Sequence, residues 1–168
     1  MTARLIVDSA ARRLTLGDWN MPCAIGRSGA CAADVKREGD GCSPIGAWPV
    51  RGALLRPGRV PPMDLAIPWR WLRAGDGWSD DPADPAYNRP VRLPRGHSAE
   101  TLCRDDSAYD VIVVLGHNDA PPVPGMGSAI FFHLWVDARP TEGCVAIARD
   151  DMLALLPMLR PGDALTII

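Results

Sequence analysis

The chain has 168 residues, a length suited to one domain with a buried core, and we expect residues 1–168 to form a single domain. Its net charge of −2 gives no electrostatic case for binding nucleic acid or an anionic membrane, and 47% hydrophobic with 23% charged residues is typical of a globular protein. The 17 prolines and 16 glycines indicate many turns and short elements, which favours a mainly β fold.

The N-terminal part of the chain reads as short strands. Apolar runs at 5–7 and 14–16 predict a hairpin, and residues 21–25 predict a further strand. A glycine-rich loop at 26–46 follows, and it lacks the spacing of a phosphate-binding P-loop.

The middle of the chain alternates strand and loop signals. Residues 47–55 predict a strand, which Pro49 would confine to a sheet edge or to a strand start. The proline-rich stretch 57–68 predicts extended coil, residues 69–71 a strand, and residues 75–88 a turn-rich loop.

Two clear strands come next, at 109–115 and 129–133, separated by a loop at 116–127. Residues 164–168 predict a closing strand. One helix is expected at 150–159, because its apolar residues recur at helical spacing, and Pro157 should end or bend that helix.

The cysteines predict neither a disulfide framework nor a metal site. Their odd number and unpaired spacing fit reduced thiols in a reducing compartment, and the three histidines form no ligand pattern. We therefore expect no metal and no cofactor. The cysteines are Cys23, Cys31, Cys42, Cys103 and Cys144.

The N-terminal sequence has no charged segment followed by an apolar run, and no apolar window is long enough to span a membrane. The expected location is the cytoplasm. The alternative is the periplasm, if a leader had been removed.

A histidine and a cysteine near the C-terminus form a candidate catalytic pair. His133 ends a predicted strand, and Cys144 follows Gly143 eleven residues later. A thiol with a pKa near ~8.5 needs a neighbouring base or cation to act as a nucleophile, and Gly143 allows close approach to it. Amides around Cys144 could form an oxyanion hole. The alternative is that Cys144 is a buried packing residue.

The sequence around this pair resembles the L,D-transpeptidase catalytic-domain (YkuD-like) family. His133 with Thr141, Gly143 and Cys144 is similar to the family's His…Ser/Thr-x-Gly-Cys signature, and 36–46 is similar to its Lys-x-Glu-Gly-Asp segment. Four further segments resemble short bacterial members, at 77–81, 86–89, 116–119 and 124–128. The resemblance implies a β-sandwich or barrel with one or two short helices.

The resemblance also implies a chemistry. Cys144 would attack the L,D-peptide bond of a murein stem peptide, and His133 would be its base, with carbapenem-type β-lactams as plausible inhibitors. The residues it implies for substrate binding are Thr141, Glu142, Arg149, Trp78, Asp80, Tyr87, Asn88, Asn118 and Ser128.

Three positions depart from the commoner family pattern. Glu142 stands where the family has His, Ala146 where it has Arg, and Leu134 where it has Gly or Ser. Without an arginine at 146, the group that binds a substrate carboxylate is open. The candidates are Arg149, Arg139 and Arg89.

The expected function is an L,D-carboxypeptidase that releases terminal D-Ala from murein tetrapeptides during peptidoglycan recycling, with water resolving the Cys144 acyl-enzyme. One alternative is an L,D-transpeptidase that cross-links peptidoglycan or exchanges D-amino acids. Another is a non-catalytic peptide-binding module, which Glu142 and Ala146 would motivate.

Overall fold

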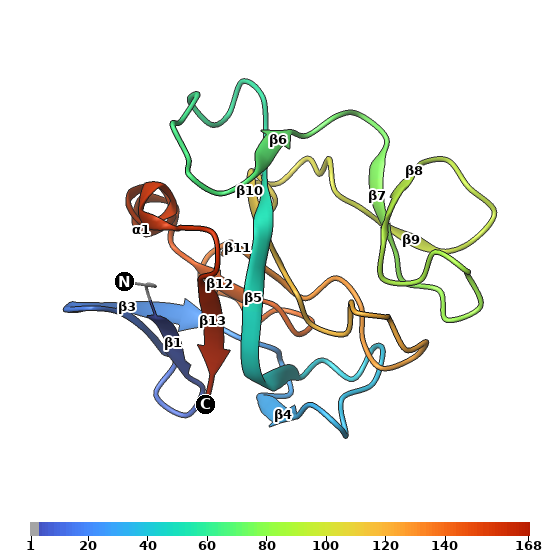
Figure 1. Ribbon diagram of the computed structural model, residues 1–168, viewed down its shortest axis with the longest axis horizontal. Helices are drawn as coiled ribbons and strands as arrows, with labels where there is room; N and C mark the ends of the chain where they lie inside the picture. The colour runs from blue at the N-terminus through green and yellow to red at the C-terminus, as the bar shows by residue number, and fades with distance from the viewer. Residues whose placement is uncertain (1–3) are drawn as a thin grey trace.

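A computed structural model describes residues 4–168 of the chain, and these residues form thirteen strands and one α-helix (Figure 1). The strands are β1 Arg4–Asp8, β2 Arg13–Leu16, β3 Trp19–Ala24, β4 Ala30–Ala32, β5 Ser43–Leu55, β6 Trp69–Trp71, β7 Asp76–Ser79, β8 Pro90–Arg92, β9 Ala99–Thr101, β10 Val111–Leu115, β11 Phe131–Leu134, β12 Val145–Ile147 and β13 Ala164–Ile167. The helix α1 spans Arg149–Leu155, and a 3-10 turn, η1, spans Leu156–Met158. The predicted mainly β fold with one or two short helices is confirmed.

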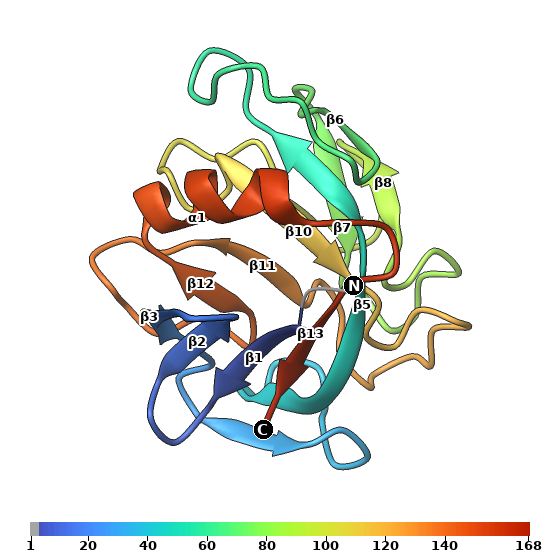
Figure 2. The same cartoon turned by 60° about the vertical axis from the view of Figure 1, so that its left-hand side comes forward.

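The main sheet closes into a barrel. Its strands follow the order β10-β11-β12-β3-β2-β1-β13-β5, and β5 pairs with β10 again to complete the ring. The first and last described strands meet in this ring, because β1 and β13 pair in parallel with Leu5 beside Leu165. Figure 2 shows these two strands side by side.

The long strand β5 joins two parts of the barrel. Its first half pairs with β13, and its second half pairs with β10. Pro49, which has no amide hydrogen, lies at the changeover, where Ala164 is its partner and the next residue, Val50, already pairs with Leu115. The prediction that Pro49 confines this strand to a sheet edge or marks its start is therefore wrong, because β5 begins at Ser43 and the changeover tolerates a missing donor inside the sheet.

The barrel interior holds the larger apolar cluster. Every second residue of β11 and β12 points inward, including Phe132 and Val145, which are at most 1% exposed. The helix α1 adds Met152 and Leu155 to this core and runs alongside the barrel (Figure 2). As predicted, the α-helix ends before Pro157, which falls within η1.

A small second sheet, β8-β7-β9, packs on the outside of the barrel. Trp78 of β7 meets the ring of Phe131 edge to face, with centroids 5.1 Å apart. Phe131, Ile112 and Leu54 form the apolar cluster between this sheet and the outer face of the barrel. The prediction that residues 75–88 are only loop is wrong, because four of them form β7, and all four are buried.

The other predicted elements agree closely with the structure. The N-terminal hairpin and the strands at 21–25, 69–71, 109–115, 129–133 and 164–168 correspond to β1, β2, β3, β6, β10, β11 and β13. The loop predicted at 26–46 contains one short strand, β4, and the start of β5. The strands β8 and β9 have only three residues each and were not predicted.

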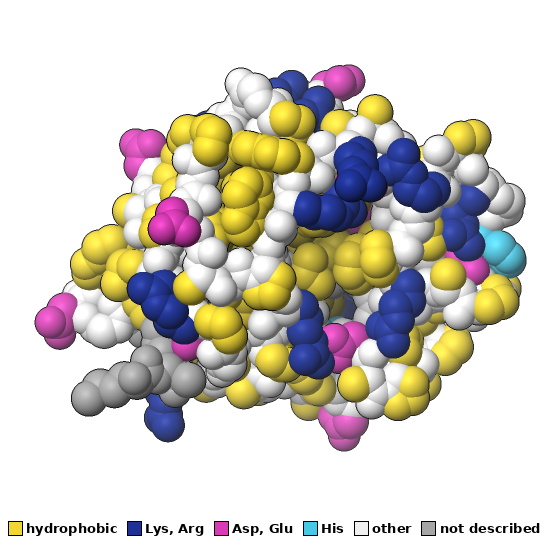
Figure 3. Space-filling view, turned by 45° about the horizontal axis from the view of Figure 1, so that its top comes forward, with side chains coloured by type: hydrophobic (Ala, Val, Ile, Leu, Met, Phe, Trp, Pro, Cys, Tyr) yellow, Lys and Arg dark blue, Asp and Glu magenta, His cyan; other side chains and the backbone are white. Residues whose placement is uncertain are grey.

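Charge is spread unevenly over the surface. On the face shown in Figure 3, lysine and arginine side chains gather around a hollow, although the net charge of the chain is −2. Among residues 4–168, no helix has the length and apolar character needed to cross a membrane.

Candidate active site

The pairing of β11 with β12 brings His133 and Cys144 to one face of the barrel. The two strands are parallel, with Phe132 beside Val145 and His133 beside Ala146. Side chains alternate along a strand, so Phe131 and His133 point outward while Phe132 points into the core. Cys144 immediately precedes β12 and shares the outward cluster of Phe131. The two predicted catalytic side chains therefore face the same cleft.

The sulfur of Cys144 is held by backbone groups on both sides. The amide of Phe131 donates to Sγ at 3.3 Å, and the thiol donates to the carbonyl of Ala129 at 3.1 Å. Ala129 has a φ of +53°, which is unfavourable for a residue with a Cβ and places strain beside the thiol. Cys144 is 7% exposed, so the resting group is a shielded thiol whose hydrogen is donated to the carbonyl of Ala129.

His133 is oriented by its own strand. Its Nδ1 lies 2.8 Å from the carbonyl oxygen of Leu134, which requires Nδ1 to carry the hydrogen and leaves Nε2 as the basic nitrogen. The ring of Tyr109 packs edge-on against the imidazole at 5.0 Å between centroids. Leu134 has no polar side chain, and its backbone carbonyl supplies the orienting hydrogen bond instead.

Burial keeps both groups neutral. It raises the pKa of the Cys144 thiol to about 12, and the negative charge of Glu100 acts in the same direction. Burial also lowers the pKa of His133 to about 4, although hydrogen bonds from the ring to backbone carbonyls oppose this shift. The pair therefore rests as thiol and neutral imidazole, and the thiol proton must pass to His133 during attack rather than before it.

The turn before Cys144 needs glycine. Gly143 has a φ of +142°, and a Cβ there would lie 2.9 Å from the carbonyl oxygen of Cys42. Thr141 Oγ1 accepts the amide of Gly143 at 3.1 Å and donates to the carbonyl of Cys144 at 2.7 Å. Ser43 Oγ donates to the carbonyl of Gly143 at 2.7 Å. Thr141 thus shapes the turn, and the Gly143 amide is already engaged by it.

A cleft of about 520 Å³ opens over the thiol. Six of the predicted site residues line it: Cys144, His133, Thr141, Glu142, Asp80 and Ser128. Gly143, Trp78, Tyr87, Asn88, Asn118 and Arg149 are not among its lining residues. Residues 36–46, expected to form part of the cleft wall, contribute Lys36, Glu38 and Gly39.

Three predicted residues, Trp78, Tyr87 and Asn88, lie behind the lining and hold its loops in place. Asn88 Oδ1 accepts hydrogen bonds from Trp78 Nε1 at 2.8 Å and from the amide of Ala129 at 3.1 Å. Tyr87 donates to Glu38 at 2.5 Å and accepts from the amide of Gly127. Through Asn88 these contacts connect Trp78 of the outer sheet to Ala129, whose carbonyl accepts the Cys144 thiol.

Asn118 has the same kind of role within the loop 116–127. Its Nδ2 donates to the carbonyls of Val123 and Gly127, and its Oδ1 accepts the amide of Val123 at 2.8 Å. Asn118 therefore closes this loop on itself rather than facing the cleft.

Of the three arginines considered as partners for a substrate carboxylate, only one lines the cleft. Arg149 pairs with Asp110 at 3.2 Å, outside the cleft, so its expected contact with substrate is corrected. Arg89 donates to the carbonyl of Asp119 and also lies outside. Arg139 lines the cleft and is largely exposed.

Several cleft residues were not predicted from the sequence. Glu100 lies on β9, and Tyr109, Arg104 and Asp106 lie just before β10. Tyr109 donates a short hydrogen bond to Glu100. Burial is the main cause that raises the pKa of Glu100, and the charges of Asp80 and Glu38 add to it. No sequence motif marks these positions, since only the packing of the outer sheet brings them to the thiol.

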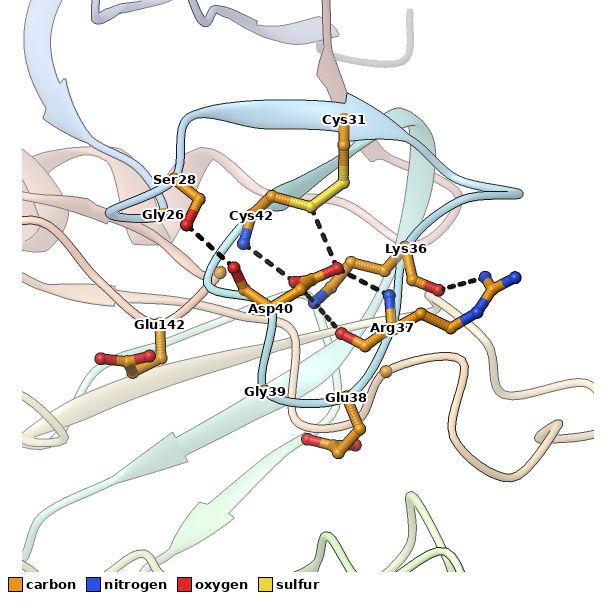
Figure 4. Close-up of polar contacts among 12 residues, drawn as sticks. Gly26, Ser28, Cys31, Lys36, Arg37, Glu38, Gly39, Asp40, Cys42 and Glu142 are labelled. Carbon is orange, nitrogen blue, oxygen red and sulfur yellow. Dashed lines mark hydrogen bonds and ion pairs between the residues drawn. A yellow bond between two sulfur atoms is a disulfide. The ribbon is translucent and has the colours of Figure 1, made fainter.

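The loop 36–42 is built around Asp40 (Figure 4). Asp40 accepts hydrogen bonds from Lys36 Nζ, from the amide of Arg37 at 2.6 Å and from the amide of Cys42 at 3.0 Å. Burial acts to raise the pKa of Asp40, but these bonds hold it below its usual value. Figure 4 shows Glu38 projecting from the far side of this loop, away from Asp40.

A disulfide joins Cys31 to Cys42, which closes the same loop onto β4 (Figure 4). The expectation that every cysteine is reduced is wrong for this pair, because β4 runs beside the start of β5 and brings the two residues to a Cα separation of 5.9 Å. Cys31, Cys42 and Asp40 are also the one group among residues 4–168 with donor atoms close enough to hold a metal ion, but here the two sulfurs are bonded to each other.

Two solved structures are similar to this chain. A structural search finds an L,D-transpeptidase from Mycobacterium smegmatis, at 13% identity and a TM-score of 0.48, over 99% of this chain and 58% of that one. It also finds L,D-transpeptidase 1 from Mycobacterium tuberculosis, at 11% identity and a TM-score of 0.44, over 99% and 59%. The chain thus spans less than two thirds of either protein.

A search of curated proteins by sequence finds no match. The family model of the L,D-transpeptidase catalytic domain (YkuD) matches residues 2–168, nearly the whole chain. The chain therefore belongs to the L,D-transpeptidase catalytic-domain family.

Proposed function

We propose that the protein cleaves the L,D-peptide bond of murein tetrapeptides through a Cys144 acyl-enzyme. Nε2 of His133 takes the thiol proton as the sulfur attacks the carbonyl carbon on the L-side of the bond. The carbon–nitrogen bond then breaks, and the imidazolium returns the proton to the departing amine of D-Ala. The support is the shared cleft, the hydrogen bond from Nδ1 of His133 to Leu134 that leaves Nε2 as the basic nitrogen, and the family to which the chain belongs.

We propose water as the acceptor that resolves the thioester. The observation that carries this choice is the charge of the cleft. Its lining includes five carboxylates and three cations, and all three cations are already paired: Lys36 with Asp40, Arg104 with Asp106 and Arg139 with Asp137. A second peptide that carries carboxylates would enter against like charge, whereas water would not.

The carboxylate of the terminal D-Ala still needs a partner. We propose Arg139, which lines the same cleft as Glu142 and whose side chain is 72% exposed. Its partner Asp137 is 77% exposed, and an exposed pair of this kind is weak, so a substrate carboxylate can replace Asp137 at little cost. Glu142 is itself paired with Arg27 at 2.9 Å, which offsets its repulsion of that carboxylate.

The product mixture tests the acceptor. With the tetrapeptide L-Ala-D-Glu-mDAP-D-Ala and an excess of a second D-amino acid, we expect tripeptide and free D-Ala to predominate. Mass spectrometry of the products distinguishes tripeptide from exchanged tetrapeptide. Predominance of the exchange product would replace the carboxypeptidase proposal with the transpeptidase alternative, while cleavage of the L,D-bond would still stand.

The compartment is a separate proposal. We propose the cytoplasm as the location, because an enzyme that trims recycled murein peptides would meet its soluble substrates there. The Cys31–Cys42 disulfide argues for the alternative, because disulfides are more usual in an oxidising compartment such as the periplasm. A reducing cytoplasm would open the Cys31–Cys42 disulfide, so this location predicts that alkylation in intact cells, followed by mass spectrometry, labels all five cysteines. Labelling of only Cys23, Cys103 and Cys144 would indicate the periplasm. Purified protein in which Cys31–Cys42 has been oxidised gives the matched three-thiol standard.

A further inference from the structure

Lys36 is the only lysine in the chain, whose 18 basic residues are otherwise arginines. Arginine presents five donors in a rigid planar fork, whereas lysine carries a compact charge with three donors that can point in different directions. Lys36 is also buried, at 2% exposure, and a buried ammonium is unfavourable unless it is paired. A single lysine at a buried position, in a chain that otherwise uses arginine, indicates that this position needs a compact ammonium.

Two acceptors fix this ammonium within the loop 36–42 (Figure 4). Nζ donates to a carboxylate oxygen of Asp40 and to the carbonyl of Arg37, the latter at 2.8 Å. An ammonium has three hydrogens, and no third acceptor for Nζ occurs among residues 4–168. Lys36 lines the cleft over Cys144 and Asp40 does not, so the cleft meets the cation of this pair rather than its anion.

The stem of Lys36 runs past the segment that holds the thiol. A Cβ on Gly127 would lie 3.3 Å from both Cγ and Cε of Lys36, so the absence of a side chain there leaves room for this stem. Two residues further along, the carbonyl of Ala129 accepts the Cys144 thiol. Burial and the charge of Glu100 raise the pKa of that thiol to about 12, and the charge of Lys36 is one of the effects that oppose them.

We infer that Lys36 is a positioning residue of the cleavage reaction, whose ammonium stabilises the negative charge that forms as Cys144 attacks. The inference rests on the proposed function. When the thiol proton passes to Nε2 of His133, the sulfur becomes negative, and as the sulfur–carbon bond forms, that charge moves to the carbonyl oxygen of the L,D-bond. A fixed, buried cation stabilises both states without contact with either atom. Arg104 and Arg139, whose side chains are 41% and 72% exposed, are screened by water and suit this role less.

Alkylation of Cys144 measures this charge without any murein peptide. Neutral iodoacetamide reports the thiolate fraction, and anionic iodoacetate reports in addition the attraction of the cleft for a negative group. Peptide mass spectrometry follows the modification of Cys144 in the full chain under non-reducing conditions. Lys36→Met keeps an unbranched stem and removes the charge. In this variant we expect iodoacetamide to react about 10-fold more slowly, because the thiolate loses a nearby cation, and iodoacetate to slow by about a further threefold.

Two further variants separate charge from structure. Lys36→Gln is neutral but still has donors for Asp40 and for the carbonyl of Arg37, and it should behave like Lys36→Met. Arg37→Met removes the neighbouring cation, which is exposed and does not line the cleft, and it should leave both alkylation rates unchanged.

Each outcome decides the role of Lys36. Wild-type rates in both neutral variants, or an equal loss for the two reagents, would overturn the role of the charge and leave the proposed cleavage standing. Failure of both neutral variants to fold, checked by circular dichroism, would assign Lys36 to the stability of the loop and would also overturn it. A wild-type Cys144 that reacts with neither reagent would overturn both proposals.

Discussion

Replacing Cys144 with serine or alanine is expected to abolish cleavage of murein tetrapeptides, because the sulfur is the proposed attacking atom. Serine keeps a donor for Ala129 and an acceptor for the amide of Phe131, so Cys144→Ser should stay close to wild type in stability. Alanine leaves both groups unpaired and should cost about 1–3 kcal/mol. Product release by chromatography and thermal unfolding measure the two effects.

A carbapenem provides an independent readout of the same thiol. We expect intact-protein mass spectrometry to show one covalent adduct on wild type and none on Cys144→Ser. Cys103, which is also free and more exposed, is the matched control, and Cys103→Ser should retain both turnover and the adduct. Full turnover by a folded Cys144→Ala protein would remove the basis of the enzyme proposal.

Loss of His133 should have the second largest effect. We expect His133→Gln or His133→Ala to slow acylation by about 10²–10⁴-fold, the usual contribution of a general base. The thiol has a pKa of about 12, so without the imidazole almost none of it ionises at neutral pH. His97→Ala is the control, since His97 pairs with Asp81 outside the cleft. Equal losses in the two variants would show that His133 is not the base.

The pH dependence of wild-type acylation tests the same residue. Because burial lowers the pKa of His133 to about 4, the imidazole remains neutral well below 6.5, and the rate should fall only as the pH approaches 4. The folded state also loses stability as the pH falls through this range, since protonation favours the unfolded chain. Circular dichroism at each pH separates the two causes, and a fall in rate near 6.5 with the fold intact would contradict the buried, neutral imidazole.

The sequence was sufficient for elements with strong local signals. Alternating and continuous apolar runs located β10, β11 and β13, and Pro157 marked the end of α1. The Cys144 and His133 pair could be predicted for the same reason, because its motif and the neighbouring strand signal fall in one short stretch of chain.

The remainder of the site depends on contacts between distant segments. Glu100 lies 44 positions before Cys144 and reaches the cleft only because β9 pairs with β7 and Trp78 packs on Phe131. The Cys31–Cys42 pair has a similar origin, since the parallel pairing of β4 with β5 creates it. Spacing alone cannot distinguish such a pair from two free thiols.

The barrel ring has a consequence for the order in which the protein can fold during synthesis. β13 lies between β1 and β5 in the ring, yet residues 164–167 are translated after the other strands of residues 4–168. Until they leave the ribosome, the edges of β1 and β5 that receive them stay unpaired, and the hydrophobic interior cannot be sealed. A nascent chain of this protein therefore exposes two open strand edges until β13 has emerged from the ribosome, and these edges favour chaperone binding or aggregation in that interval.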